Sequence, residues 1–251
     1  MRGEVVGINT AIVRGGSGIG FAIPSNMAKR VASDLRTSGK VTRGWLGISL
    51  QPLTSDLAGS FGVKDTKGAL VSDVSADSPA ARGGLKSGDV ITSFNGKKVD
   101  DPSGLARAVA SAKPGETSKV TVWRERQEKM LEVKLGEMPG ERTAAAAPGG
   151  GKDVGKTSLG LAVQNVTPEI AEQLELKNAT GVVITRVDPS GPAGEAGLQR
   201  GDVITEVDRK PVKSVDDFDK ATTDKKQLLM KVQRGGTSLF VAMAPTAADR
   251  K

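Results

Sequence analysis

The sequence predicts a mainly β protein with short helices, an α+β fold built from two tandem copies of one small domain. First, Gly-Asp-Val-Ile-Thr at 88–92 recurs at 201–205, and further matches keep the same offset of 113 residues. Second, 32 glycines and 12 prolines in 251 residues indicate a chain rich in turns and strands. Third, no apolar run approaches the length of about 18 residues that a membrane span needs, so we expect none.

The repeat extends along the whole of each copy. At the offset of 113 residues, Leu-Gly-Ile at 46–48 pairs with Leu-Gly-Leu at 159–161. Near the end the offset falls to 110, which pairs Arg124 with Arg234, so about three residues are missing from the second copy. We therefore expect one domain over 44–138, a second over 157–247, and a tail over 248–251.

Each copy is expected to form a small sheet with helical inserts. A helical turn should begin at Ser78-Pro79, with Ser78 as its cap, and a longer helix at Asp101-Pro102. That helix carries Leu105, Val109 and Ala112 on one face and ends at 113–115. The expected strands are 45–50, 69–74, 90–95, 119–124 and 130–135, and the second copy repeats this order with a helix over 215–222 and last strands over 228–232 and 239–243.

Residues 139–156 have the composition of a flexible Pro/Ala/Gly linker, which predicts that the two domains move relative to each other. Residues 150–157 also satisfy the phosphate-binding pattern G-x-x-x-x-G-K-[ST]. That site needs a strand before it and a helix after it, because helix amides bind the phosphates. Here a linker precedes the pattern and a strand follows it. We interpret the match as coincidental and expect no nucleotide.

Composition excludes several kinds of site. The chain has no His and no Cys, so it holds no Ser-His-Asp triad, no Cys-His dyad, no Cys/His zinc site and no disulfide. Its net charge of +7 comes with only 3% aromatics, which favours scattered lysines over a nucleic-acid surface. The pairs Asp100-Asp101 and Asp216-Asp217 start helices and are expected to cap them. Asp89 and Asp202 are expected to bind turn amides. We predict no catalytic residue, cofactor or metal.

Residues 1–43 lie outside the repeat. Segments 4–9 and 19–23 are predicted strands joined by a glycine-rich turn. Pro24-Ser25 is expected to cap a helix that bears Met27, Val31 and Leu35 and ends at Gly39. Two strands and one helix cannot bury a core of their own, so this segment is expected to be an incomplete part of a larger domain.

The Leu-Gly-apolar sequences predict a binding site at the first strand of each copy. A glycine there lets the backbone turn tightly and aim successive N–H groups at one point, forming an anion nest. The helix beside the strand would complete a groove, where an extended peptide adds a strand and places its terminal carboxylate in the nest. Alternatively, Gly47 and Gly160 simply open a strand; a helix in register at both copies favours the groove.

The candidate residues follow from that geometry. In the first copy we expect the amides of Leu46, Gly47 and Ile48 to bind the carboxylate, Ser49 and Leu50 to pair with the peptide, and Leu105, Ala108 and Val109 to line an apolar pocket. The corresponding residues of the second copy are Leu159, Gly160, Leu161, Ala162, Val163, Phe218, Ala221 and Thr222. Thr222 in place of Val109 predicts a more polar second pocket and weaker or different selection there.

These motifs resemble the bacterial, circularly permuted PDZ domain. The marks are the Leu-Gly-apolar loop, Ser-Pro-Ala at 78–80 with Gly-Pro-Ala at 191–193, and Gly-Leu-x-x-Gly-Asp-Val-Ile at 84–91 and 197–204. Segments 3–12 and 18–25 resemble the last strands of the trypsin-like barrel of an HtrA/Deg serine protease. The resemblance covers nearly the whole chain and implies two tandem permuted PDZ domains preceded by a C-terminal fragment of that barrel.

The resemblance also implies a function. It implies a regulatory region that binds C-terminal or exposed apolar segments of unfolded or damaged proteins. The family acts in periplasmic quality control and the stress response, and the resemblance implies that the region also takes part in oligomer assembly. The family's Ser, His and Asp would lie before Met1, so the chain as given is not expected to be an enzyme, although its family is one of serine endopeptidases. Residues Ile8, Asn9, Thr10 and Ala11 match the strand that lines the family's specificity pocket.

Two alternatives remain open. The natural polypeptide is a complete periplasmic serine endopeptidase of which these residues are the C-terminal part, or the tandem domains form an assembly scaffold whose grooves bind neighbouring subunits. Residues 1–4 open no signal peptide. A trimer of the family's kind needs an intact barrel, so we expect either a monomer or a poorly folded N-terminal segment, and oligomers through PDZ contacts remain an option.

Overall fold

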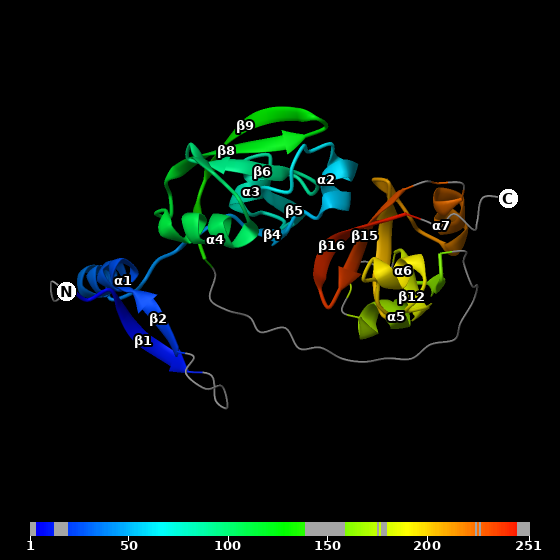
Figure 1. Ribbon diagram of the computed structural model, residues 1–251, viewed down its shortest axis with the longest axis horizontal. Coiled ribbons are helices and arrows are strands. Elements are labelled where there is room, and N and C mark those ends of the chain that lie inside the picture. Colours follow the sequence, from blue (N-terminus) through cyan, green and yellow to red (C-terminus); the bar gives the residue numbers. More distant parts are fainter. Residues whose placement is uncertain are drawn as a thin grey trace.

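The structure is a computed structural model, and it describes residues 4–12, 20–138, 159–174, 176, 180–223, 225 and 227–244. It contains an N-terminal hairpin and helix followed by two six-stranded sheets, each with its own short helices (Figure 1). The predicted fold class, mainly β with short helices, is confirmed. The predicted linker, including the phosphate-loop-like segment 150–157, and the predicted tail lie outside the described residues.

The first sheet has the strand order β4-β5-β6-β8-β9, with β7 paired to β6, which makes β4 an edge strand. A separate short pair, β3 with β10, joins the two ends of this domain. Its elements are β3 (Gly44–Trp45), β4 (Ile48–Gln51), α2 (Ser55–Phe61), β5 (Ala69–Val74), α3 (Pro79–Arg82), β6 (Val90–Phe94), β7 (Lys97–Lys98), α4 (Pro102–Ser111), β8 (Thr117–Arg124), β9 (Gln127–Lys134) and β10 (Gly136–Glu137).

The second sheet repeats this arrangement, with the order β11-β12-β13-β15-β16 and β14 paired to β13. Both edge strands carry a bulge at the same place, between Ser49 and Leu50 in β4 and between Ala162 and Val163 in β11. The elements are β11 (Leu161–Asn165), α5 (Pro168–Gln173), β12 (Val182–Val187), α6 (Pro192–Glu195), β13 (Val203–Val207), β14 (Lys210–Pro211), α7 (Val215–Thr222), β15 (Leu228–Arg234) and β16 (Thr237–Met243).

Helix starts of the first domain follow the predicted capping, whereas the cap of α7 in the second domain is Ser214 and not the predicted Asp216-Asp217 pair. The Ser78 hydroxyl accepts a hydrogen bond from the Ala81 amide at 3.1 Å, with Pro79 at the first helical position. Asp101 accepts from the Gly104 amide at 2.8 Å. In α7 the cap is Ser214, and Asp216 and Asp217 occupy the first turn. Helices α2 and α5, which have only seven and six residues, were not predicted from the sequence.

A buried ion pair ties the end of each sheet to the turn before its third strand. Asp89, 1% exposed, accepts from the Lys86 amide at 2.8 Å and from two nitrogens of Arg124 at 2.6 and 2.7 Å. Arg124 also donates to the Gly84 carbonyl at 2.7 Å, and these bonds to Asp89 raise the pKa of Arg124. Asp202 and Arg234 repeat the pair at 2.6 and 2.7 Å. The prediction that both aspartates bind turn amides is confirmed, and each also pairs with an arginine.

The N-terminal segment leaves its apolar side chains exposed. Strands β1 (Gly7–Ile12) and β2 (Gly20–Pro24) pair antiparallel, and helix α1 (Ser25–Ser38) ends at Gly39, whose φ of 69° is left-handed. Phe21 is 56% exposed and Leu35 50% exposed. The expected cap at Pro24-Ser25 is wrong in detail, since Pro24 occupies the cap position and makes no side-chain hydrogen bond. As expected, the described part of this segment encloses no core.

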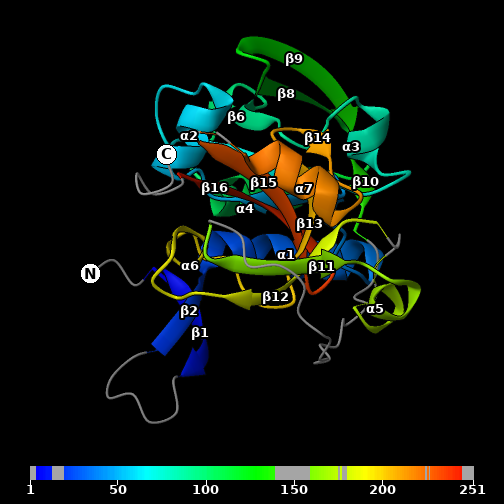
Figure 2. The ribbon, with the colours of Figure 1, turned by 90° about the vertical axis from the view of Figure 1, so that its right-hand side faces the viewer.

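The two domains pack against each other through a third apolar cluster. Leu70 and Val90 alternate along their strands with residues of the first core, so this cluster lies on the opposite face of the first sheet. Helix α2 covers that face, and Phe61 meets Phe240 of β16 edge-on, with ring centroids 5.3 Å apart. Figures 1 and 2 place β16 beside α2. The linker composition predicted independent domains, and the structure shows them in contact because each has an apolar face that the other covers.

One polar contact fixes the two domains in register. The side-chain amide of Gln51, the last residue of β4, donates to the Phe240 carbonyl at 3.0 Å and accepts from the Phe240 amide at 2.7 Å. Gln51 thereby takes the place of a neighbouring strand along the outer edge of β16. Arg209 lies over the Phe61 ring, 5.0 Å from its centroid.

Candidate functional site

The loop before β4 turns two successive amides away from the domain. The Leu46 carbonyl accepts from the Ala80 amide at 2.9 Å, and the Gly47 carbonyl accepts from the Ser75 amide at 2.9 Å. In a trans peptide unit the N–H points opposite to the C=O. The N–H groups of Gly47 and Ile48 therefore point outward, at the start of the open edge of β4. This arrangement suits an anion nest.

The nest requires glycine at its centre. Gly47 has a φ of 75°, and a Cβ there would overlap the Ser78 side chain and lie 2.9 Å from the Trp45 ring. Gly160 has the same φ of 75°, but a Cβ at Gly160 would meet its nearest atoms, in Gly191 and Asp188, at 3.3 and 3.4 Å. The second loop has the same carbonyl contacts, from the Ala193 amide to Leu159 at 3.2 Å and from the Asp188 amide to Gly160 at 2.7 Å. Both loops thus share one geometry, and the first is packed more tightly.

The helix residues predicted to line the pocket lie at different depths. Leu105 and Phe218 are 0% exposed and belong to the domain cores, so their side chains pack below the predicted pocket and do not reach its surface. Ala108 and Ala221 are partly buried against the same clusters, which also contain Leu50 and Val163. The side chains of Leu46, Leu159 and Leu161 are at most 2% exposed and anchor the two loops. The structure therefore brings the apolar residues of the predicted site into one cluster in each copy: Leu46, Ile48, Leu50, Leu105, Ala108 and Val109 in the first, and Leu159, Leu161, Val163, Phe218 and Ala221 in the second. Gly47, Ser49, Gly160, Ala162 and Thr222 do not belong to these clusters.

Thr222, which was predicted to make the second pocket more polar, uses its hydroxyl within α7. The hydroxyl donates to the Phe218 carbonyl one turn earlier, at 3.0 Å. A hydroxyl that binds its own helix contributes little polarity to a neighbouring pocket. Weaker or different selection at the second site stays a prediction.

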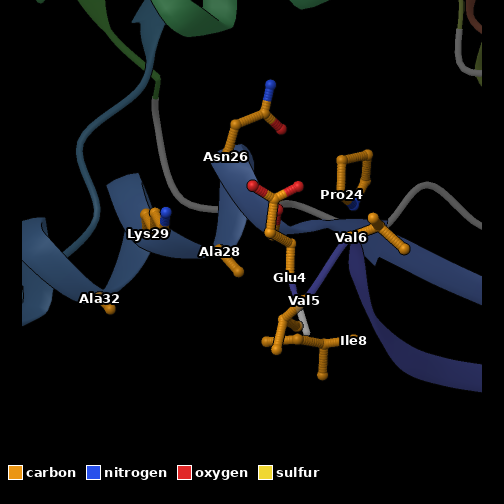
Figure 3. Close-up of a pocket in the computed structure, with 10 residues that line it drawn as sticks. Glu4, Val5, Val6, Ile8, Pro24, Asn26, Ala28, Lys29 and Ala32 are labelled. Carbon is orange, nitrogen blue, oxygen red and sulfur yellow. The ribbon is translucent and has the colours of Figure 1, made fainter. Parts of the chain in front are cut away.

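The predicted specificity-pocket strand lies in β1. Ile8, Asn9 and Thr10 are exposed, and the Thr10 hydroxyl donates to the Phe21 carbonyl at 3.3 Å, while the Ala11 side chain lies outside the described residues. An open depression of about 920 Å³ separates the start of the chain from α1, and Figure 3 shows the side chains around it. Its lining residues are Glu4, Val5, Val6, Ile8, Pro24, Ser25, Asn26, Ala28, Lys29 and Ala32. These lining side chains include no His and no Cys.

The described part of the chain holds neither a cluster of metal ligands nor a membrane-spanning helix. No three acidic, His or Cys side chains there come together as a metal site. No helix within the same residues is both long and apolar enough to cross a bilayer.

Comparison with known proteins identifies the two domains. Family models of the PDZ domain match residues 44–135 and 183–234. The chain contains two PDZ domains. In both, the Leu-Gly-apolar loop leads into the edge strand, β4 or β11.

Relatives of the whole chain are serine endoproteases. This chain is 41% identical over 255 residues to a probable periplasmic serine endoprotease, DegP-like, of Brucella suis. The alignment covers 97% of this chain and 48% of the relative. A protein with the same description from Rhizobium meliloti is 39% identical over 260 residues, covering 98% of this chain and 50% of the relative. The chain therefore spans about half the length of the curated relatives it matches.

A solved structure agrees with this family. The HtrA-type protease AlgW, solved with a tripeptide, aligns with a TM-score of 0.50 and 40% identity, covering 55% of this chain and 47% of that chain. The predicted resemblance to DegP-like proteases of the HtrA type is confirmed.

Proposed function

We propose that this chain is the peptide-binding, regulatory region of an HtrA-type serine endoprotease that acts on unfolded or damaged proteins in the periplasm. Each PDZ domain binds the C-terminal or exposed apolar end of a polypeptide as an added strand. The first site is the edge of β4 with α4 beside it, and the second site is the edge of β11 with α7 beside it. Proteolysis itself belongs to the complete protein, which would supply the triad that this sequence lacks.

The observation that carries the proposal is the pair of outward amides at Gly47 and Ile48, at the start of an edge strand. A carboxylate can accept a hydrogen bond from each of these two N–H groups at once, and charge-assisted hydrogen bonds of this kind are about twice as strong as neutral ones. The peptide behind the carboxylate would pair antiparallel with Ile48, Ser49 and Leu50. Its apolar side chains would contact Ala108 and Val109. A structure of AlgW with a tripeptide and a structure of an AlgW variant with a decapeptide support peptide binding by this kind of protein.

An assembly scaffold is the second candidate, because the edge strands β4 and β11 could pair with neighbouring subunits instead of with peptides. In that case the outward amides would bind no free carboxylate.

The test is a fluorescence-anisotropy titration of a short apolar peptide, once with a free carboxylate and once amidated. PDZ recognition of one strand is expected in the micromolar range, about −8 kcal/mol. We expect the amidated peptide to bind at least about tenfold more weakly, because it lacks the anion. Gly47→Ala, which would place a Cβ against Ser78, should remove binding of the free acid at the first site. The matched control is Gly59→Ala in α2, since nothing lies within 4 Å of a Cβ at Gly59. Equal binding of both peptides would favour the scaffold.

A further inference from the structure

A single side chain spans the far end of the second site. The Oδ1 of Asn165 accepts the backbone N–H of Val215 at 2.8 Å. Asn165 is the last residue of β11, and Val215 is the first residue of α7; both elements are labelled in Figure 2. We call this hydrogen bond the Asn165 bridge. It joins the two elements between which a peptide would lie, at the end opposite the Gly160 loop.

The first domain cannot form the same bridge. The offset of 113 residues places Pro52 opposite Asn165 and Pro102 opposite Val215. Pro52 has no side-chain acceptor, and Pro102, at the first position of α4, has no N–H to donate. The chain thus carries one bridged and one unbridged copy of the same site.

The bridge is incompatible with a strand at that point. A peptide added to β11 needs one strand spacing of about 4.8 Å on its β11 side and similar room on its α7 side. The Asn165 bridge occupies that space with one side chain and one hydrogen bond. A peptide that runs antiparallel from the Gly160 loop would meet it after about four residues, one for each β11 residue before Asn165. Longer peptides must break the bridge or leave the strand edge.

We propose that Asn165 determines the specificity of the second PDZ domain, closing the far end of its site and restricting it to short C-terminal segments, while the first domain admits longer ones. This inference rests on the proposed peptide-binding function. Val215 is packed against the core of the second domain, so breaking the bridge releases the start of α7 from β11 but leaves the helix on the core. The cost of admitting a long peptide is therefore about one exposed hydrogen bond.

A capping role alone would give a different result. Ser214 already accepts the Asp217 amide at 3.2 Å, so the Asn165 bridge satisfies a second amide of the first turn of α7. Were the bridge only a cap, removing it would lower the stability of the domain and leave the affinities for short and long peptides in the same ratio. The ratio of those affinities is thus the decisive quantity.

The test uses the full chain labelled with ¹⁵N, because the amide resonances of Gly47 and Gly160 monitor the two sites separately. Two N-acetylated peptides with the same apolar C-terminal sequence, of four and ten residues, are titrated into it. At Gly160 we expect the ten-residue peptide to bind about fivefold more weakly than the four-residue peptide, the equivalent of one net hydrogen bond. At Gly47 we expect no such penalty.

Four variants complete the design. Asn165→Ala should raise the affinity of the long peptide at Gly160 to that of the short one and leave Gly47 unaffected. Asn165→Asp keeps the acceptor and should keep the penalty. Pro52→Asn combined with Pro102→Val should transfer the penalty to the first site, whereas Pro52→Asn alone should not, because Pro102 has no N–H.

The outcomes separate the inference from the function on which it rests. Equal affinity of both peptides at Gly160 in the unmodified chain overturns the inference, as does a penalty that Asn165→Ala leaves in place. If the four-residue peptide perturbs neither Gly47 nor Gly160, the proposed function fails and the inference with it.

Discussion

Removing the Arg124 side chain should destabilise the first PDZ domain selectively. Arg124 gives Asp89 two hydrogen bonds, of 2.6 and 2.7 Å, and Asp89 is 1% exposed. Leaving one partner of a buried ion pair alone costs about 3–5 kcal/mol. The Lys86 amide still binds Asp89 at 2.8 Å, so we place Arg124→Ala at the lower end, about 3 kcal/mol. Arg234 is 35% exposed, and water can replace more of its role, so Arg234→Ala should cost about 2 kcal/mol.

The positions of the tryptophans make the assay specific to one domain. The chain has two tryptophans, Trp45 and Trp123, and both lie in the first domain. Guanidinium unfolding followed by tryptophan fluorescence therefore reports the first domain and, through Trp123, its contact with the second domain, while far-UV circular dichroism reports both domains. Arg124→Ala should move the fluorescence transition to lower denaturant, and Arg234→Ala should move mainly the dichroism transition.

The control is Arg107→Ala, which removes an exposed arginine from α4 and should change the free energy of unfolding by less than about 0.5 kcal/mol. A loss below about 1 kcal/mol for Arg124→Ala would place the pair in the range of surface ion pairs and refute the reasoning from burial.

Three further predictions follow from the same structure. Gly47→Ala should abolish binding of a free-acid peptide at the first site, because a Cβ at Gly47 would overlap its neighbours. Gly160→Ala should weaken binding at the second site only in part, because a Cβ there would lie 3.3–3.4 Å from its neighbours. Calorimetric titration of each variant checks both outcomes. Phe240→Ala removes the ring that meets Phe61 and should separate the domains, seen as a larger radius of gyration in small-angle X-ray scattering; an unchanged radius contradicts the packing. The chain has no His. The pKa values of Arg124 and Arg234 are raised by their bonds to Asp89 and Asp202, so the arginine contribution is fully present across pH 6 to 9 and is lost only as pH rises through those raised values. The free energy of unfolding should therefore vary by less than about 1 kcal/mol between pH 6 and 9, and a titrating step in that range would show that a group outside these pairs controls stability.

Local sequence signals predicted the parts of the fold that depend on neighbouring residues. The caps at Ser78 and Asp101 follow from residue type and the helix that comes after them. The repeat predicted that Gly47 and Gly160 share one role, and both have a φ of 75°. Such features need no knowledge of the tertiary structure.

Features that join distant residues could not be predicted in the same way. Asp89 and Arg124 are 35 residues apart, and the offset that pairs Arg124 with Arg234 was the only sign that both arginines share a role. Helical periodicity placed Leu105 on the apolar face of its helix, but it could not show whether that face contacts a ligand or the core. The Asn165 bridge joins residues 50 apart, and its sequence sign, an Asn opposite Pro52, acquires meaning only once β11 and α7 are placed.

The packing of the two domains was the least predictable feature. It depends on α2, which the sequence patterns did not indicate, and on the alternation that turns Leu70 and Val90 away from the first core. The linker composition predicted freedom of movement, because composition describes the linker and not the surfaces that it connects.

The most direct test of the central claim is a map of amide shifts in the full chain when a four-residue apolar peptide is added, first as the free acid and then as the amide. Peptide binding at the nests predicts that the acid perturbs Gly47, Ile48 and Gly160, and that the amidated peptide does so at least about tenfold more weakly. Perturbations confined to Gln51 and Phe240, or equal for both peptides, would contradict recognition of a carboxylate by the PDZ domains and favour an assembly surface.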